Sequence, residues 1–167
     1  LEGTGLPPVT VDLYTPEFEA AIKLADNFVK NISDPSAKDR YDDMSVNLKG
    51  LVLSHFIDNI ANITKETADN IENTLKMSEE VNGELVHRWL QTAIISGHQT
   101  APFEAADAFV ASIGRMKFVI PVYAALAKAD MDSAKAIFAK HIDFYHPIAK
   151  GKIEDLLSKG EMAQVSE

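Results

Sequence analysis

Two cations separated by one residue, Arg115 and Lys117, are the residues whose types and spacing most clearly suggest chemistry. They lie in the stretch GRMKFVIP, between a glycine and an apolar run, in a chain whose formal net charge is −9. An arginine binds a carboxylate through two parallel hydrogen bonds, and a nearby lysine adds a point charge. The pair therefore suggests an anion site. The alternative, which residue types alone favour, is that both cations neutralise the negative C-terminal end of the preceding helix.

The histidines form no recognisable catalytic or zinc-binding motif. The sequence lacks H-E-x-x-H, a glycine-rich phosphate loop and G-x-S-x-G. His141 and His146, with Asp143 between them, could suggest a metal site. The simpler interpretation is that His146 caps a helix beginning at Pro147 and that His141 lies in the last turn of the helix before it. His55 lies on an apolar stripe and is predicted to be a hydrogen-bonded core residue. We therefore predict no catalytic residue and no metal ligand in this chain.

The segment around the only tryptophan also needs an interpretation. Trp89 lies at helical spacing with Leu85 and Ala93, so we predict that it packs in the core. Arg88, beside it, is either a solvated charge or the partner of an acidic residue.

Composition excludes several classes of partner. A net charge of −9 argues against nucleic acid and against an anionic membrane surface, because both require a basic patch. No apolar run approaches the roughly 18 residues of a spanning helix. With no cysteine, the chain has neither disulfides nor thiolate metal sites. The first residues, LEGTGLPPV, lack the features of a signal peptide, so we expect a cytoplasmic protein. Export is the alternative, because Leu1 does not look like a natural N-terminus.

Apolar residues recur at helical spacing along the chain, and no segment alternates like a strand. Thr15, Asn82 and Asp130 are predicted N-caps, and residues 33–43 are predicted to be a loop. The pattern predicts an all-α fold of about eight helices, at about 16–31, 47–62, 65–76, 83–95, 102–113, 118–129, 131–144 and 147–160.

The short connections between these helices predict neighbouring antiparallel pairs. Such pairs stack as a bundle or as an α-solenoid, and the sequence shows no fixed-period repeat to decide between them. We expect residues 1–14 to be a linker, residues 15–160 to be one helical domain, and residues 161–167 to be a frayed tail.

Four stretches, in order along the chain, resemble the leukotriene A4 hydrolase and aminopeptidase B group of zinc aminopeptidases. GRMKFVIPVY, residues 114–123, resembles the group's G-R-M-K-F-x-R-P-x-[FY] segment. The other three stretches are GLPPV at 5–9, HRWLQTAI at 87–94 and FAKHIDFYHPIAKGKIEDL at 138–156. Together they make the chain similar to the C-terminal helical domain of such an enzyme.

The resemblance implies a fold and a role. The fold would be an α-α superhelix, a right-handed solenoid of the armadillo or HEAT kind. Arg115 and Lys117 would bind the C-terminal carboxylate of a short peptide substrate in a cleft shared with the catalytic domain. This chain would hold no cofactor and would not be catalytic alone, whereas the parent protein would be an aminopeptidase with zinc in its catalytic domain. Its partners would then be the catalytic and N-terminal domains of the same polypeptide.

Two departures from the group's pattern bear on the site. Ile120 stands where the group often has a second arginine, and Val86 stands where it has the first arginine of R-x-R-W-L. The alternative to the enzyme reading is a free-standing α-solenoid scaffold that binds another protein.

Overall fold

Helices make up every regular element in the described part of the chain, residues 15–97 and 100–165 of the computed structural model. The predicted all-α class is therefore confirmed. The α-helices are α1 (Pro16–Val29), α2 (Ala37–Asp42), α3 (Val46–Asp58), α4 (Lys65–Leu75), α5 (Gly83–Ile95), α6 (Thr100–Ser112), α7 (Met116–Ala129), α8 (Met131–His141) and α9 (Pro147–Val165). Short 3-10 turns follow α3, α4 and α8, at Ile60–Asn62, Met77–Glu79 and Ile142–Phe144.

Polar side chains start several of these helices as the sequence predicts. Thr15, Asn82 and Asp130 each accept a hydrogen bond from a backbone N–H in the first turn of the following helix. Such a bond pairs one of the N–H groups that a helix start leaves without a partner. These caps therefore fix where α1, α5 and α8 begin.

Most helix boundaries lie within a few residues of the prediction, and two differences are larger. The supposed loop 33–43 contains α2, because Ala37 and Tyr41 stand one turn apart and are both buried, at 1% and 2% exposure. α9 continues to Val165, so Gly160 does not end it. The linker assigned to residues 1–14 lies outside the described residues.

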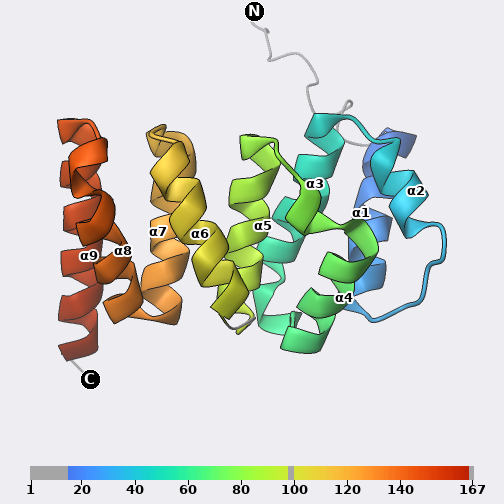
Figure 1. Ribbon diagram of the computed structural model, residues 1–167. Coiled ribbons are helices and arrows are strands. Elements are labelled where there is room, and N and C mark those ends of the chain that lie inside the picture. The colour runs from blue at the N-terminus through green and yellow to red at the C-terminus, as the bar shows by residue number, and fades with distance from the viewer. Residues whose placement is uncertain (1–14, 98–99, 166–167) are drawn as a thin grey trace, which may run out of the picture.

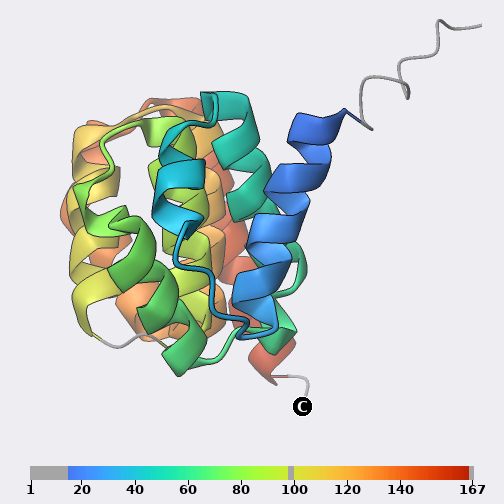
Figure 2. The same ribbon diagram turned by 90° about the vertical axis from the view of Figure 1, so that its right-hand side faces the viewer.

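The helices form a row of antiparallel pairs in two layers (Figure 1). Helices α1, α3, α5, α7 and α9 each contact the next member of this series and make one layer. Helices α2, α4, α6 and α8 lie in the other layer, as the view from the α1 end shows (Figure 2). The antiparallel pairing agrees with the short connections, whereas a right-handed superhelical twist stays a prediction.

The alternating direction brings the starts of the first-layer helices to one edge of the molecule, the upper edge in Figure 1. We call it the N-terminal edge. A helix carries about half a positive charge at its N-terminus. Five such ends, of α1, α3, α5, α7 and α9, therefore line this edge of an acidic protein. The residues that stand just before these helices are Thr15, Ser45, Asn82, Arg115 and His146.

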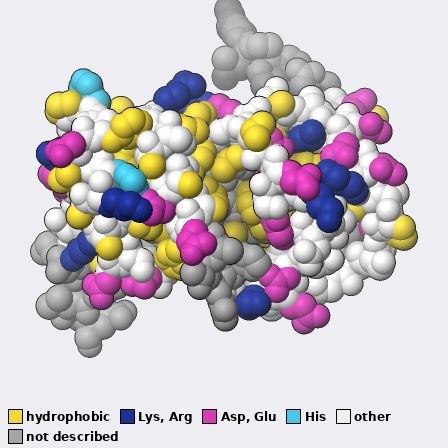
Figure 3. Space-filling model, in the orientation of Figure 1, with side chains coloured by type: hydrophobic (Ala, Val, Ile, Leu, Met, Phe, Trp, Pro, Cys, Tyr) yellow, Lys and Arg dark blue, Asp and Glu magenta, His cyan; other side chains and the backbone are white. Residues whose placement is uncertain are grey.

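The core has two parts that meet at α5. One cluster of buried side chains lies among α1 to α5, and the other lies among α5 to α9. Trp89 is 6% exposed in the first cluster, which confirms the predicted core position. Where the clusters meet, α4 and α6 leave a groove of about 450 Å³ with Trp89 and Leu90 in its lining. Apolar side chains gather in this hollow at the centre of Figure 3.

Candidate functional site

The two cations singled out by the sequence lie at the N-terminal edge, at the start of α7. Arg115 is the residue before the helix, and Lys117 is its second residue. Both side chains are exposed, that of Lys117 by 59%. A cation at a helix N-terminus faces the positive end of the dipole, which disfavours it. Lys117 therefore gains nothing from the dipole of its own helix.

A buried ring holds the two cations together. The guanidinium carbon of Arg115 lies 5.2 Å from the centre of the Phe118 ring, and Nζ of Lys117 lies 5.6 Å from it. Both distances fall within the range of cation–π attraction. Phe118 is only 6% exposed, so it is an anchored platform. Sequence reasoning missed this role, although Phe118 stands three residues after Arg115, a spacing that brings side chains together at the start of a helix.

An acidic residue from α5 reaches the same place. Lys117 Nζ donates a hydrogen bond to Oε1 of Glu84 over 2.6 Å, and Arg88 lies 3.3 Å from the other carboxylate oxygen. The Lys117 hydrogen bond, aided by Arg88, lowers the pKa of Glu84. We call Glu84, Arg88 and Lys117 the edge cluster. Arg88 is therefore the partner of an acidic residue, one of its two predicted roles, whereas the role of Glu84 was missed.

Arg115 differs from the other two arginines of the chain. Arg40 is paired with Asp34, and Arg88 is paired with Glu84. Arg115 makes no ion pair with any residue in the described ranges, and its contact there is the Phe118 ring. Its guanidinium donors therefore remain directed at solvent, available to an anion.

The start of α7 is also bare of a capping side chain. Thr15, Ser45 and Asn82 cap α1, α3 and α5 through their side chains, and His146 Nδ1 accepts from the N–H of Ile148 in α9. Arg115 makes no such bond at the start of α7. Along the N-terminal edge, within the described residues, the guanidinium thus stands at a helix start with no internal acceptor. An approaching carboxylate would meet both positive groups.

A neutral histidine supports the platform from below. His87 is 6% exposed, and its ring lies 5.1 Å from the Phe118 ring at an angle of 32°. Burial, with the charges of Arg88 and Lys117, lowers the pKa of His87 to about 4. At neutral pH the imidazole therefore adds no charge to the site, and it serves as packing.

A hollow of about 450 Å³ adjoins the edge cluster between α3, α5 and α7. Its lining includes Glu84, Arg88 and Lys117 together with small or polar residues of α3. A Cβ on Gly50, in this wall, would make ordinary contact with the Arg88 guanidinium at 3.6 Å. The hollow therefore gives small polar groups access to Lys117.

At the two positions where the chain departs from the group's pattern, the side chains pack against other apolar residues. Ile120 is partly buried and packs against the second core cluster. Val86 does the same, and it lines the groove between α4 and α6. Neither position supplies a further charge to Arg115.

The other histidines in the described part of the chain, His55, His141 and His146, have structural partners. His55 Nε2 lies 2.7 Å from a carboxylate oxygen of Asp26, which confirms the predicted hydrogen bond, and the side chain is 19% exposed. His141 ends α8 against Asp107, and His146 caps α9, both as predicted.

Within residues 15–97 and 100–165, no group of three or more acidic or histidine residues could hold a metal ion. In the same ranges, no helix is long and apolar enough to cross a membrane.

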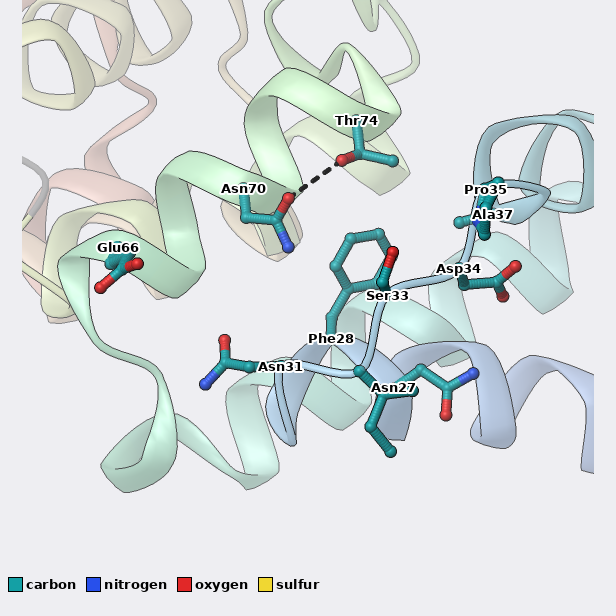
Figure 4. Close-up of a pocket in the computed structure, with 11 residues that line it drawn as sticks. Asn27, Phe28, Asn31, Ser33, Asp34, Pro35, Ala37, Glu66, Asn70 and Thr74 are labelled. Atoms are coloured by element: carbon teal, nitrogen blue, oxygen red, sulfur yellow. Dashed lines mark hydrogen bonds between the residues drawn. The ribbon is translucent and has the colours of Figure 1, made fainter.

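A second hollow, of about 680 Å³, lies away from Arg115, between the C-terminal end of α1, the following loop and α4 (Figure 4). Its lining is rich in amides. Two of the amide oxygens bond to the chain itself: Asn70 accepts from Thr74 over 3.2 Å, and Asn31 accepts from Thr67 over 3.3 Å.

Comparison with known proteins bears on the whole chain. Residues 44–157 match the family model described as leukotriene A4 hydrolase, C-terminal. The chain is 33% identical to leucine aminopeptidase 2 of Pyricularia oryzae over 96% of its length, and 30% identical to that of Neurospora crassa over 98%. These matches cover 26% and 24% of the two relatives, so the chain spans about a quarter of their length.

Solved structures agree on the fold. Native yeast LTA4 hydrolase matches with a TM-score of 0.73 at 22% identity, over 94% of this chain and 28% of that one. The yeast enzyme in complex with Bestatin gives a TM-score of 0.72 at 21% identity, over 92% of this chain and 28% of that one. The resemblance drawn from the four sequence stretches is confirmed: this chain belongs to the leukotriene A4 hydrolase C-terminal domain family.

Proposed function

We propose that this chain is the C-terminal domain of a zinc-dependent aminopeptidase and that it binds the C-terminal carboxylate of short peptide substrates. Two relatives that align with nearly the whole chain are named leucine aminopeptidase 2. The chain lines the substrate cleft and is not catalytic alone. Its partners are the catalytic and N-terminal domains of the same polypeptide.

The observation that carries this proposal is the state of Arg115. It is exposed at the start of α7, and it has no ion pair within the described residues. A guanidinium presents donors in a fork that matches a carboxylate. The anchored Phe118 ring restricts the side chain before a ligand arrives, which lowers the entropy cost of binding.

Lys117 plays the second part. Its ammonium is already bound to Glu84, so it adds less charge to the site than a free lysine would. It remains 59% exposed, and an ammonium has three donors, so it can hold Glu84 and a substrate carboxylate together. Arg115 is thus the primary contact, and Lys117 is the auxiliary one.

The hydrolytic chemistry lies in the catalytic domain. A zinc ion bound there would activate the water that attacks the scissile carbonyl. The residues of this chain act at the far end of the substrate. By fixing the carboxylate they favour peptides short enough to span from Arg115 to the catalytic domain.

Substitution of Arg115 in the full-length protein tests this function. A charged hydrogen bond is worth roughly 1.5–3 kcal/mol, so Arg115→Ala should lower kcat/KM for short free-acid peptides by about ten- to over a hundredfold. The same peptides with amidated C-termini should be hydrolysed equally by the variant and the wild type. Lys128→Ala, an exposed cation in the last turn of α7, is the matched control and should change neither rate. Equal losses for acids and amides in Arg115→Ala would refute the carboxylate role.

A further inference from the structure

Exposed apolar side chains concentrate on the edge that carries Arg115. The large apolar residues most exposed in the described ranges are Ile32, Val46, Val81, Phe144 and Ile148. All but Ile32 stand at the starts of first-layer helices: one begins α3, one precedes the cap of α5, and two flank the start of α9. Scattered single apolar residues need no explanation, whereas a concentration beside a charged site marks a surface that something covers.

Phe144 is the member of this set that touches the Arg115 loop. A Cβ built on Gly114 would lie 3.6 Å from Cε1 of the Phe144 ring, so the ring packs directly on the residue before Arg115. The ring is nevertheless 51% exposed. One part of it therefore covers the loop, and another part faces solvent.

The position of this ring is fixed from behind. Phe144 meets the Tyr145 ring at 5.7 Å between centres, with an angle of 69° between the planes. The Tyr145 hydroxyl lies 2.8 Å from that of Tyr123 and donates to the carbonyl of Val110 over 3.1 Å. Since Tyr145 and Tyr123 are buried at 6% and 0% exposure, Phe144 rests on a rigid support.

We propose that Phe144 determines specificity by receiving the side chain of the substrate's C-terminal residue while Arg115 holds its carboxylate. In any peptide the terminal carboxylate and the terminal side chain leave the same Cα. A group that binds the side chain must therefore stand next to the group that binds the carboxylate. Phe144 is the exposed apolar residue that contacts this loop, because it packs against Gly114, the chain neighbour of Arg115.

The site would prefer peptides that end in a large apolar residue. Covering an exposed aromatic face with leucine removes apolar area from water on both partners, whereas alanine covers little of it. A few methylene groups in an apolar subsite discriminate by about ten- to a few hundredfold, and a half-open ring lies at the low end of that range. This inference rests on the proposed carboxylate site. It adds which C-terminal residue of the substrate that site would prefer.

Four peptides and the full-length protein test the inference. They share one sequence except that they end in leucine or alanine, each as the free acid and as the amide. Wild type should prefer leucine over alanine by about tenfold in kcat/KM among the free acids. Phe144→Ala should reduce this ratio to between one and two while keeping the preference for acid over amide. Ile32→Ala, which removes a side chain of 53% exposure beyond the C-terminal end of α1, should leave both ratios unchanged.

The outcomes separate this inference from the proposed function. An unchanged leucine-to-alanine ratio in Phe144→Ala overturns it. An equal loss for all four peptides with a lower melting temperature also overturns it, because Phe144 would then support another part of the polypeptide. If instead Arg115→Ala retains the preference for acid over amide, the carboxylate site itself is wrong.

Discussion

Two ionic clusters in this molecule are built alike but differ in the charged residues that stand beside them. In the edge cluster, Glu84 binds Lys117 over 2.6 Å and Arg88 over 3.3 Å. Between α6 and α8, Asp107 binds Lys140 over 2.6 Å and also meets His141. We call Asp107, Lys140 and His141 the α6–α8 cluster. Each cluster uses one carboxylate to join groups from two helices, and in each the pairing lowers the pKa of that carboxylate.

The difference lies in what stands beside each cluster. Near the edge cluster, Arg115 shares the Phe118 ring with Lys117 and has no carboxylate within the described residues. When every charge of a cluster is paired within the protein, the cluster serves to join helices. A cation that stands beside such a cluster without a partner can bind a ligand. Within the described residues, Arg115 is thus an unpaired cation beside the edge cluster, while the α6–α8 cluster joins two helices.

The largest expected effect concerns the ring beneath the edge cations. Phe118→Ala should lower the free energy of unfolding of this chain by about 3–5 kcal/mol, because the ring is 6% exposed in the core. Phe138→Ala should cost about the same, because Phe138 is 7% exposed and packs on Tyr123 and Tyr145. Denaturant unfolding of the two variants measures both values.

These two variants sharpen the comparison through ligand binding. In the full-length protein, the remaining activity of Phe118→Ala should lose its preference for free acids over amides, because Arg115 loses its platform. Phe138→Ala should keep that preference. A preference retained in both variants would mean that the ring supports the fold alone.

The sequence predicts the elements of this protein better than the surroundings of its site. Caps and apolar stripes are local signals, so α1, α5 and α8 begin where Thr15, Asn82 and Asp130 indicate. The six-residue α2 was missed, because one and a half turns show too little periodicity and Pro35 suggests a loop. Short helices are stabilised by tertiary burial, here of Ala37 and Tyr41.

The residues around Arg115 were only half predictable. Arg115 and Lys117 stand out in the sequence because they lie within one short motif, GRMK at residues 114–117, with a single residue between them. Glu84, by contrast, lies 33 residues before Lys117, and nothing in the local pattern links them. Phe144 is likewise brought to Gly114 by the packing of α7 against α8 and α9. Contacts between helices far apart in sequence arise from the fold, which one sequence does not reveal.

The next largest effect is on pH dependence near the edge cluster. The pKa of His87 is about 4 in the folded protein against an ordinary value of 6.5. Between these values the unfolded chain binds a proton that the folded chain does not, so stability falls as pH decreases from 6.5 to 4. The loss should reach about 3 kcal/mol. Denaturant unfolding at a series of pH values measures it.

Two variants test whether His87 causes this change of stability with pH. His87→Phe, which keeps an aromatic ring against Phe118, should flatten the dependence between pH 6.5 and 4.5. Lys117→Gln should reduce it, because Lys117 is one of the charges that lower the pKa of His87. The contributions of Glu84 and Asp107 are lost at lower pH, below the ordinary pKa values of 4.5 and 3.8, so the slope above pH 4.5 reports mainly His87. A slope that persists in His87→Phe would assign the effect to another group.

The smallest effect separates the two clusters most directly. Glu84→Gln removes the carboxylate that occupies Lys117, so the ammonium can turn fully to a substrate carboxylate. For free-acid peptides the full-length variant should show a KM lower by about two- to fivefold, the range of an exposed ion pair, with little change in kcat. Asp107→Asn is the matched control at the α6–α8 cluster. It should lower the melting temperature and leave KM unchanged, because no substrate group competes for Lys140.

The direction of the change in KM decides what Glu84 does. If Glu84→Gln raises KM for free acids and leaves amides unchanged, the carboxylate positions Lys117 for the substrate rather than competing with it. If Asp107→Asn shifts KM as much as Glu84→Gln, the two clusters do not differ in function, and Arg115 alone distinguishes the N-terminal edge. A lower KM confined to Glu84→Gln and to free acids, and weakened by added salt, is the result that the geometry of Lys117 between Glu84 and Arg115 predicts.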